Sequence, residues 1–400
     1  MSRKNYDEIK KKFGQFIDTW KTRKIDVLET IFDKDVICFL STVKAYPCGS
    51  QHSLFGIKNF VNDIPKSDVF HSRICNYACR IGEGEAQQVA HVVCVAAKFE
   101  KGSNEPKTFE FTAMFANHWI IKEKGWLIDE IRMDLVKHGG DLESFEEAWY
   151  FDIPNAKWYP GVHFPCILGE LDSPWNKIKN PVDCGLSDKE QIMEVFAKYA
   201  YAIDHNIFGH MENVLTEDVT SIMPPWGDMT KRKWIEALKF HRQCDRYWTH
   251  PGKLYEVIIE NDKAHAVIYR MSGHNQRTHP YHYTKANIDI EHACARYVFD
   301  FRKEEGAWKI FRCRYYLGFV ELGKYQDDLY DDTGKYSRLP GEFIRAICLY
   351  SGSGEYKTSL NWRKEKIMKL AVFDIDGTLI SQKNHSISDT TILALRKLKE

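Results

Sequence analysis

The stretch that decides the fold is DKEQIMEVFAKYAYAIDHNIFGHMENVLTEDV, residues 188–219, because its outline occurs twice in the chain. Residues 6–36, YDEIKKKFGQFIDTWKTRKIDVLETIFDKDV, carry apolar side chains at matching positions when the two stretches are offset by 183 residues. In both, apolar residues recur every three or four positions, the period of an amphipathic helix. The pattern predicts a pair of helices in each stretch, ending at Val36 and at Val219.

Similar strand-like sequence follows each predicted helical pair. After a short helix, the runs AHVVCVAAKF from Ala90 and AHAVIYRM from Ala264 are rich in β-branched residues, as strands are. A hairpin pattern follows, in which Trp126 matches Trp308 at an offset of 182 residues. A register kept over this length indicates a tandem duplication. The order of elements predicts an α+β fold of two tandem cones, each a cystatin-like curved sheet with helices.

Composition excludes several classes of protein. Lys plus Arg equals Asp plus Glu, at 56 each, so the formal net charge is zero. A neutral chain argues against nucleic acid, or an anionic membrane, as a partner held by bulk electrostatics. Eleven cysteines occur without a CxxC pair, which favours reduced thiols in a cytoplasmic protein over a zinc site. No signal-peptide pattern and no apolar stretch of membrane-spanning length occur in the sequence.

The second repeat resembles a known family. Its segments KYAYAID, ENVLTEDV and GAWKI are similar to sequences of the SnoaL-like branch of the nuclear-transport-factor-like superfamily. The resemblance covers residues 186–322 and, more weakly, residues 5–137. It implies a pocket between the curved sheet and the helices that takes a small-molecule ligand. Enzymes of this superfamily include dehydratases, isomerases and polyketide cyclases, and such cones often pair through their sheets, so a homodimer is possible.

The resemblance also implies a catalytic aspartate late in the first helix of the cone. Asp204 occupies that place, whereas the register-matched residue of the first repeat is Lys21. A carboxylate in an apolar pocket becomes a useful general base near neutral pH. The candidate partners are His250 and His292, and the candidate substrate-binding residues are Tyr201 and Trp226. Ordinary alternatives remain open: Asp204 as a capping or salt-bridging residue, and Trp226 as a buried structural side chain.

A different motif lies in MKLAVFDIDGTLISQKNHSISDTTILALRKLKE, residues 368–400. The apolar run LAVFDI is typical of a buried parallel strand, and it delivers Asp374 and Asp376 at its carboxyl end, where α/β folds bind ligands. This segment resembles the Cof-like branch of the haloacid dehalogenase superfamily of phosphatases. We expect an incomplete α/β Rossmann-like segment here, because the later motifs of that family do not appear before residue 400.

The resemblance implies a role for each residue of this loop. Asp374 would attack the phosphorus of a phosphate ester, and Asp376 would donate and accept the proton. Both would hold Mg²⁺, which offsets the repulsion between carboxylate and phosphate. Gly377 would allow the tight turn and Thr378 would hold the phosphoryl oxygens. We expect the 400-residue chain alone to have no phosphatase turnover.

Two hypotheses of different class follow. In the first, the second cone binds or transforms a small molecule by proton transfer and is fused to the start of a phosphatase. In the alternative, the cones are non-catalytic and mediate dimerisation or regulate a sugar-phosphate phosphatase. Under both, the predicted domains are a degenerate cone at 1–137, an ordered linker at 138–185, a cone with a candidate pocket at 186–322, a linker at 323–366 and the phosphatase-like segment at 367–400.

Overall fold

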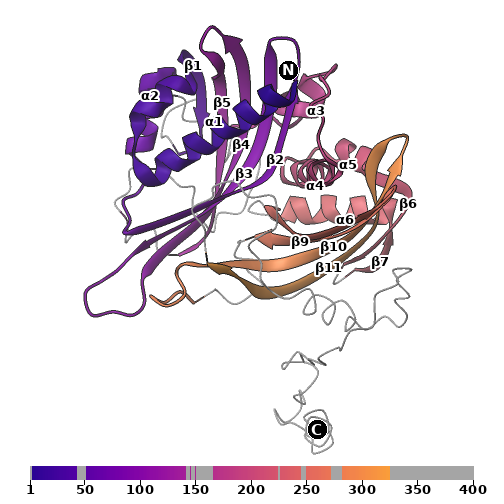
Figure 1. Ribbon diagram of the computed structural model, residues 1–400. Helices are drawn as coiled ribbons and strands as arrows, with labels where there is room; N and C mark the ends of the chain where they lie inside the picture. The colour runs from indigo at the N-terminus through magenta and orange to yellow at the C-terminus, as the bar shows by residue number, and fades with distance from the viewer. Residues whose placement is uncertain are drawn as a thin grey trace, which may run out of the picture. The chain divides into compact units, whose positions relative to one another are not determined.

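The computed structural model describes two curved sheets with helices packed on them (Figure 1). All the described residues belong to one compact unit of the chain, Met1–Ser337, and the second unit, Arg338–Glu400, lies outside them. The fold class is therefore mixed α+β, as predicted from the order of elements. The structure describes residues 2–42, 51–140, 145, 149, 165–223, 226–244, 249–271 and 282–324.

The first half of the described chain, residues 2–140, forms a five-stranded sheet in the order β1-β5-β4-β3-β2. Its long helix lies across the sheet, and the shorter helix lies beside β1 (Figure 1). The elements are α1 (Ser2–Thr22), a 3-10 helix η1 (Ile25–Thr30), β1 (Phe32–Leu40), α2 (Ser53–Asn62), β2 (Val69–Ile81), β3 (Glu85–Lys98), β4 (Lys107–Lys122) and β5 (Gly125–Gly140).

The second half, residues 186–324, forms a six-stranded sheet in the order β7-β6-β11-β10-β9-β8. Two short elements precede it, η3 (Gly169–Asp172) and α3 (Pro174–Lys177). The elements of the half itself are α4 (Asp188–Asp204), α5 (Gly209–Val214), β6 (Leu215–Met223), β7 (Gly227–Thr230), α6 (Lys231–Cys244), β8 (Gly252–Glu260), β9 (Lys263–Met271), β10 (Ile290–Glu304) and β11 (Ala307–Lys324).

The two sheets have equivalent strand orders and equivalent registers. Apart from β7, each strand of the second sheet occupies the place of one strand of the first. In both halves the first strand pairs parallel with the last one, at Ile37 opposite Glu130 and at Thr220 opposite Arg312. These pairs keep the offsets of 183 and 182 residues that the sequences show. The duplicated pattern therefore has a counterpart in the backbone.

One part of the predicted element pattern was wrong. The acidic-valine pairs, Asp35-Val36 and Asp218-Val219, lie inside β1 and β6 rather than at the end of a second helix. After α1 the chain makes only a short 3-10 turn, and the strand then alternates between buried and exposed residues. The error arises because a short strand with an irregular apolar pattern resembles the continuation of an amphipathic helix. Both strands pair parallel with the last strand of their sheet, β1 with β5 and β6 with β11.

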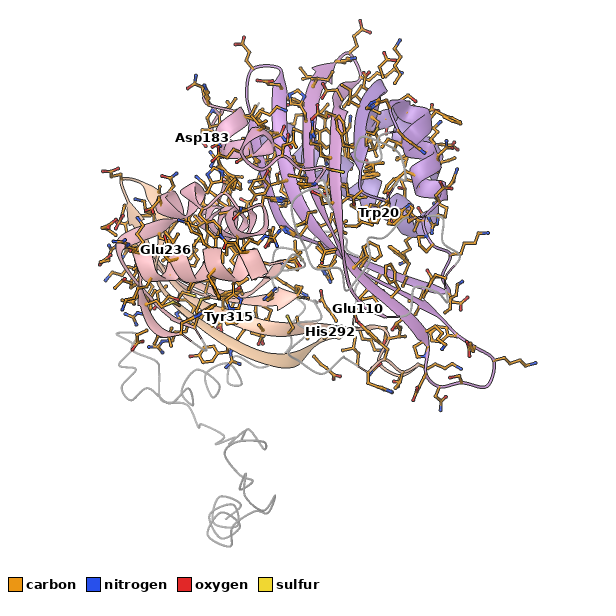
Figure 2. All side chains as sticks on the ribbon, turned by 180° about the vertical axis from the view of Figure 1, so that it is seen from behind. Trp20, Glu110, Asp183, Glu236, His292 and Tyr315 are labelled. Carbon is orange, nitrogen blue, oxygen red and sulfur yellow. The ribbon has the colours of Figure 1, made fainter. Side chains whose placement is uncertain are left out.

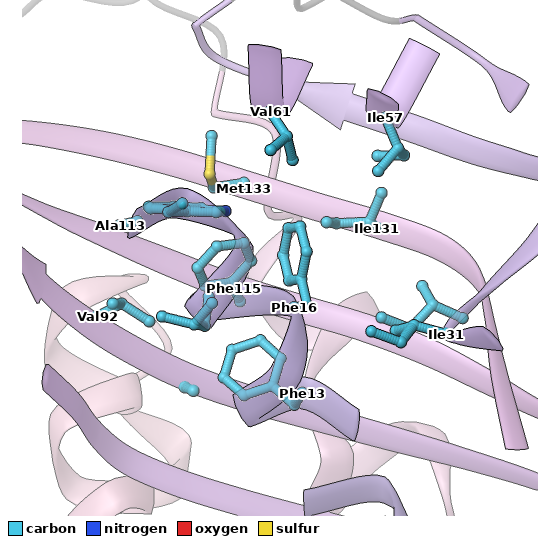
Figure 3. Close-up of a cluster of buried hydrophobic side chains, with 14 of the residues drawn as sticks. Phe13, Phe16, Ile31, Ile57, Val61, Val92, Ala113, Phe115, Ile131 and Met133 are labelled. Atoms are coloured by element: carbon cyan, nitrogen blue, oxygen red, sulfur yellow. The ribbon is translucent and has the colours of Figure 1, made fainter. Parts of the chain in front are cut away.

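The core of the first half lies between α1 and the concave face of its sheet. The apolar face of α1 carries Phe13, Phe16 and Trp20, which are fully buried. Their rings meet Phe115 of β4 at centroid distances of 5.4–6.0 Å. Figure 3 shows these phenylalanine rings among the aliphatic side chains of the sheet. This burial of large apolar surface is the main stabilising contribution of the half.

The other face of the first sheet is covered by the second half. Along β3 nearly every residue is buried, although a sheet with one solvated face would alternate. Val89 and Met114 on that face form one apolar cluster with Ala197 and Tyr201 of α4. The two halves therefore share a buried junction, in which α4 packs against both its own sheet and the sheet of the first half.

In the part of the chain that the structure describes, no helix is long and apolar enough to cross a membrane. Eight of the cysteines within the same part are free thiols in buried positions.

Candidate functional site

Asp204, the last residue of α4, lies at the centre of the junction. The helix is fixed at its start by a capping box, in which Ser187 and Glu190 satisfy each other's backbone N–H groups. Its last carbonyl, that of Asp204, accepts a hydrogen bond from Arg242 of α6 at 2.6 Å. The Asp204 side chain has 0% of its surface exposed. A carboxylate buried this deeply requires several donors.

His250 supplies two of those donors. Its Nδ1 lies 2.5 Å from Oδ1 of Asp204, and its backbone N–H donates to Oδ2 at 2.9 Å. His250 precedes β8, and the strand begins at Gly252, directly beneath α4. A Cβ atom at Gly252 would stand 2.0 Å from the ring of Phe196, so only glycine fits there. The predicted neighbourhood of Asp204 and His250 is therefore present in the structure.

His91, from β3 of the first half, supplies the remaining donor. Its Nε2 lies 2.9 Å from Oδ2 of Asp204, and its side chain is 4% exposed. The sequence analysis did not single out His91, which lies in the strand-like run AHVVCVAAKF without a motif around it. It joins the site because the outer face of this strand meets the second half, where Asp204 needs a partner.

Asn76 of β2 determines which nitrogen of His91 carries the proton. The carbonyl oxygen of the Asn76 side chain accepts from the backbone N–H of Gly252 at 2.9 Å. Its amide nitrogen therefore donates, to the backbone oxygen of His250 at 2.7 Å and to Nδ1 of His91 at 3.1 Å. Because Nδ1 of His91 accepts, Nε2 holds the proton and donates to Asp204. The first half thus sets the hydrogen-bond pattern around a carboxylate of the second.

Burial and charge act in opposite directions on the pKa of Asp204. Burial raises it, but the attraction and hydrogen bonds of His250 and His91 outweigh burial and hold the pKa well below its usual value. Burial lowers the pKa of His250 to about 4, against the opposing pull of Asp204. Near neutral pH, Asp204 is therefore an anion and His250 a neutral imidazole. With its proton on Nδ1, His250 has Nε2 as its basic nitrogen.

The side of Asp204 that faces the first half is closed. A small void there is bounded by Asn76, His91, Tyr201 and His205, and it has no room for a water molecule. A substrate cannot reach the carboxylate from that side. The prediction that Asp204 itself lines a pocket is not supported, because the two histidines cover it.

On the side away from Asp204, His250 faces polar groups of the second half. Its ring lies 6.5 Å from that of Tyr199, centroid to centroid. Arg270 of β9 donates to the backbone oxygen of Thr249 at 2.8 Å and to the hydroxyl of Tyr315 at 3.2 Å. Burial alone would lower the pKa of Arg270, but Tyr315 and Cys294 raise it, so the guanidinium is charged. A cation and a neutral imidazole therefore lie close together in the interior of the second half.

His292, the other predicted partner of Asp204, is placed elsewhere. It lies near the start of β10, where its Nε2 is 4.0 Å from a carboxylate oxygen of Glu110 on β4. Its ring also meets Tyr283 at 5.6 Å. Figure 2 shows His292 and Glu110 side by side. The prediction was wrong because the sequence cannot show how far along β10 the residue facing α4 falls.

Tyr201 faces the first half, whereas Trp226 packs at the edge of the core of the second half. The hydroxyl of Tyr201 donates to the backbone oxygen of Gly169 at 2.8 Å, and its ring packs on the first half. Two residues along a helix turn the side chain by about 200°, so Tyr201 faces away from Tyr199. Trp226 is half-buried and meets the ring of His241 at 4.4 Å. Both residues pack against neighbouring elements. For Trp226 this agrees with the alternative that it is a structural side chain.

The predicted phosphatase-like residues, Asp374, Asp376, Gly377 and Thr378, lie outside the described residues, together with the segment 367–400 that carries them. The Mg²⁺ ion and the phosphate ester that they imply therefore stay predictions. Among the residues that the structure describes, no group of three or more His, Cys, Asp and Glu side chains is arranged to hold a metal ion.

Comparison with known proteins agrees with the fold of the second half. Residues 185–314 match the family model described as a SnoaL-like domain. No curated protein matches the chain. Among solved structures, the chain is similar to the Kfla4162 protein from Kribbella flavida, with 15% identity over 34% of this chain and 93% of that one, and a TM-score of 0.29.

Two further structures show the range of these likenesses. One is the hexachlorocyclohexane dehydrochlorinase LinA-type3 from Novosphingobium barchaimii, with 14% identity over 34% of this chain and 86% of that one, and a TM-score of 0.27. The other is an NTF2-like protein from Cytophaga hutchinsonii, with 19% identity over 33% of this chain and 100% of that one, and a TM-score of 0.25. The family match is thus confined to residues 185–314, within the second half of the described chain.

Proposed function

We propose that the second half catalyses proton transfer on a small apolar molecule, as an isomerase or a lyase, with His250 as general base and Asp204 as its orienting carboxylate. The observation that carries this proposal is the 2.5 Å contact between Nδ1 of His250 and a fully buried carboxylate. A base oriented by a third group is the usual arrangement for activating a proton acceptor. The histidine is neutral at pH 7, so it can accept a proton.

The proposed step balances as follows. Nε2 of His250 takes a proton from a carbon beside a carbonyl group, and the electron pair of the C–H bond moves to the carbonyl oxygen. The resulting imidazolium is stabilised by the Asp204 anion, which remains ionised. The enolate then receives a proton at another carbon, which completes an isomerisation, or it expels a leaving group, which completes an elimination. Arg270 is the cation near this site that can stabilise the developing oxyanion.

The first half has a supporting role in this proposal. His91 and Asn76 hold Asp204 in place without touching the substrate, so they are positioning residues. The alternative, in which the halves are binding or regulatory modules, is supported by the closed side of Asp204. It predicts ligand binding or dimerisation without turnover.

The test uses proton exchange, which needs no knowledge of the natural product. Small cyclic and aromatic ketones are incubated with the protein in D₂O, and deuterium at the carbon beside the carbonyl is followed by NMR. We expect exchange with at least one ketone, reduced at least 100-fold in His250→Gln and in Asp204→Asn. If no ketone exchanges its proton, or if the exchange persists in His250→Gln, the non-catalytic alternative is favoured.

We also propose, from the sequence motif alone, that residues 367–400 carry the catalytic loop of a phosphatase of the haloacid dehalogenase type. The motif FDIDGT supplies a nucleophile in Asp374 and an acid in Asp376, at a spacing that suits Mg²⁺-assisted phosphoryl transfer. The test is hydrolysis of p-nitrophenyl phosphate with Mg²⁺. Robust turnover by the 400-residue chain that survives Asp374→Asn would overturn this assignment.

A further inference from the structure

A cavity of about 450 Å³ lies at the junction, on the face of α4 that points away from the core of the second half. It is bounded by the end of β2, the segment 181–186, α4 and the hairpin that joins β10 to β11. Its size is that of a pocket for a small organic molecule. Figure 2 shows Asp183, one of its rim residues, beside the helices of the second half.

This cavity is separate from the Asp204 site. Among its lining residues is Lys198, whereas the neighbouring Tyr199 belongs to the core of the second half. Consecutive residues of a helix point about 100° apart, so α4 itself divides the two places. A ligand here would contact neither His250 nor Asp204.

The apolar part of the cavity is aromatic and aliphatic. Trp308 is 3% exposed, and its indole N–H donates to Asp188 at 2.9 Å, which fixes the ring. Trp175 is half-buried and is held by edge contacts to Tyr201 and His210 at 6.0 and 5.7 Å. Rigid aromatic walls suit a flat ring, because little side-chain entropy is lost on binding.

Among the described residues that line the cavity, one cation makes no ion pair. Arg80 and Glu194 form an ion pair at 2.9 Å and neutralise each other. Asp183 is exposed at the rim and accepts a hydrogen bond from the backbone N–H of Gly185. Lys198 has an ammonium 5.5 Å from the ring centroid of Trp175, and within the described part of the chain it makes no ion pair.

The protonation of Lys198 agrees with this geometry. Burial is the largest effect and, with the nearby Arg80 charge, it lowers the pKa of Lys198 to about 8, although the Glu194 charge acts in the opposite direction. A half-buried cation of this kind gains a partner when an anion binds. Because Lys198 is the lining cation that makes no ion pair among the described residues, an anion of one charge fits better than a phosphate dianion.

We propose that this cavity is a second ligand site, which binds a small aromatic carboxylate with its ring between Trp175 and Trp308 and its carboxylate on Lys198. The proposal does not depend on the chemistry assigned to His250 and Asp204. It gives the junction a function of its own, as a place where a metabolite of this class is sensed or held.

The test is isothermal titration of the full chain with 2-naphthoate at pH 7, beside its neutral analogue 2-naphthamide. We expect saturable binding of the acid and binding of the amide that is at least tenfold weaker. Lys198→Met should weaken the acid at least tenfold, while Lys198→Arg keeps affinity within a few-fold. The matched control is Lys189→Met, nine residues earlier and so on the opposite face of α4, which should change nothing.

The pH dependence gives an independent readout. Affinity for 2-naphthoate should fall as pH rises above about 8, because the free ammonium is then lost. Folding of every variant is checked by its thermal midpoint. The proposal is overturned if no saturable binding is found, if the acid and the amide bind equally, or if folded Lys198→Met binds like the wild type. It is also overturned if folded Asp204→Asn, rather than Lys198→Met, loses the binding.

Discussion

The two halves of the molecule have the same strand order, yet they differ at the end of their long helices. In the second half that position is Asp204, buried beneath His250 and His91. In the first half the register-matched residue is Lys21, which is exposed. The first half has no carboxylate at that position, but it contributes His91 and Asn76 to the carboxylate of its neighbour. One copy of a repeated fold can thus lose its own site and still help to build that of the other.

A histidine in each of the corresponding strands β3 and β9 shows the same division. His91 on β3 faces the junction and is 4% exposed, whereas His265 on β9 is 28% exposed and pairs with Asp300 at 2.6 Å. The difference arises because the second half covers the outer face of the first sheet. Corresponding strands of a repeat therefore have different environments when only one copy is covered.

The strongest test of this comparison exchanges the residue at the end of each long helix for asparagine. Asp204→Asn should lower the free energy of unfolding by about 3–5 kcal/mol, since it removes the anion from a buried hydrogen-bonded group. Lys21→Asn, on the surface, should change it by less than about 0.5 kcal/mol. Urea denaturation of both variants measures the difference. Equal effects would show that the halves are more alike than the structure indicates.

The second test concerns these two histidines, His91 and His265. His91→Leu should lower the free energy of unfolding by about 2–3 kcal/mol, because Asp204 and Asn76 each lose a buried hydrogen-bond partner. His265→Leu should cost less than about 1 kcal/mol, because its ion pair with Asp300 is partly exposed. The same denaturation measurement applies. A larger effect at His265 would contradict the assignment of His91 to the site.

The third test is the dependence of stability on pH. Burial lowers the pKa of His250 from 6.5 to about 4, so between these values the unfolded chain binds more protons. Stability should then fall with decreasing pH through this window, by up to about 1.4 kcal/mol per pH unit. Substitution of His250 by glutamine should flatten this slope, which denaturation at pH 4.5, 5.5 and 6.5 would measure.

His118 of the first half should act in the opposite direction. Burial lowers its pKa, but Asp129 and Glu85 outweigh burial and raise it. Its contribution is present below pH 6.5 and is lost as pH rises through the raised pKa. NMR titration of the ring protons of His250 and His118 would separate the two. If both titrate near 6.5, the contrast between the buried and the paired histidine is wrong.

The smallest expected effect is at the start of α4. Ser187→Ala should lower the free energy of unfolding by about 1 kcal/mol, since it removes the capping hydrogen bond to the backbone N–H of Glu190. Ser187→Asp should retain most of the stability, because aspartate also caps a helix. A thermal-midpoint comparison of the two variants is sufficient. Equal losses in both would show that the cap is not what fixes this helix.

The sequence by itself determined the repeat, its offsets and the face of each long helix that is buried. These follow from local periodicity, which depends only on the spacing of apolar residues. It also placed Asp204 at the end of a helix beside a histidine of the same half. It failed at β1 and β6, where a short strand follows a helix too closely for its alternation to be recognised.

Only the tertiary structure decided which side chains meet across the junction. His91 is 113 residues from Asp204 in the chain, and Asn76 is 176 residues from Gly252. No local pattern encodes such contacts, because they depend on how the outer face of one sheet packs on the helix of another. The same packing placed His292 against Glu110 and left Lys198 beside a cavity with no ion pair among the described residues. Periodicity specifies the elements, whereas the burial of polar groups between them specifies the site.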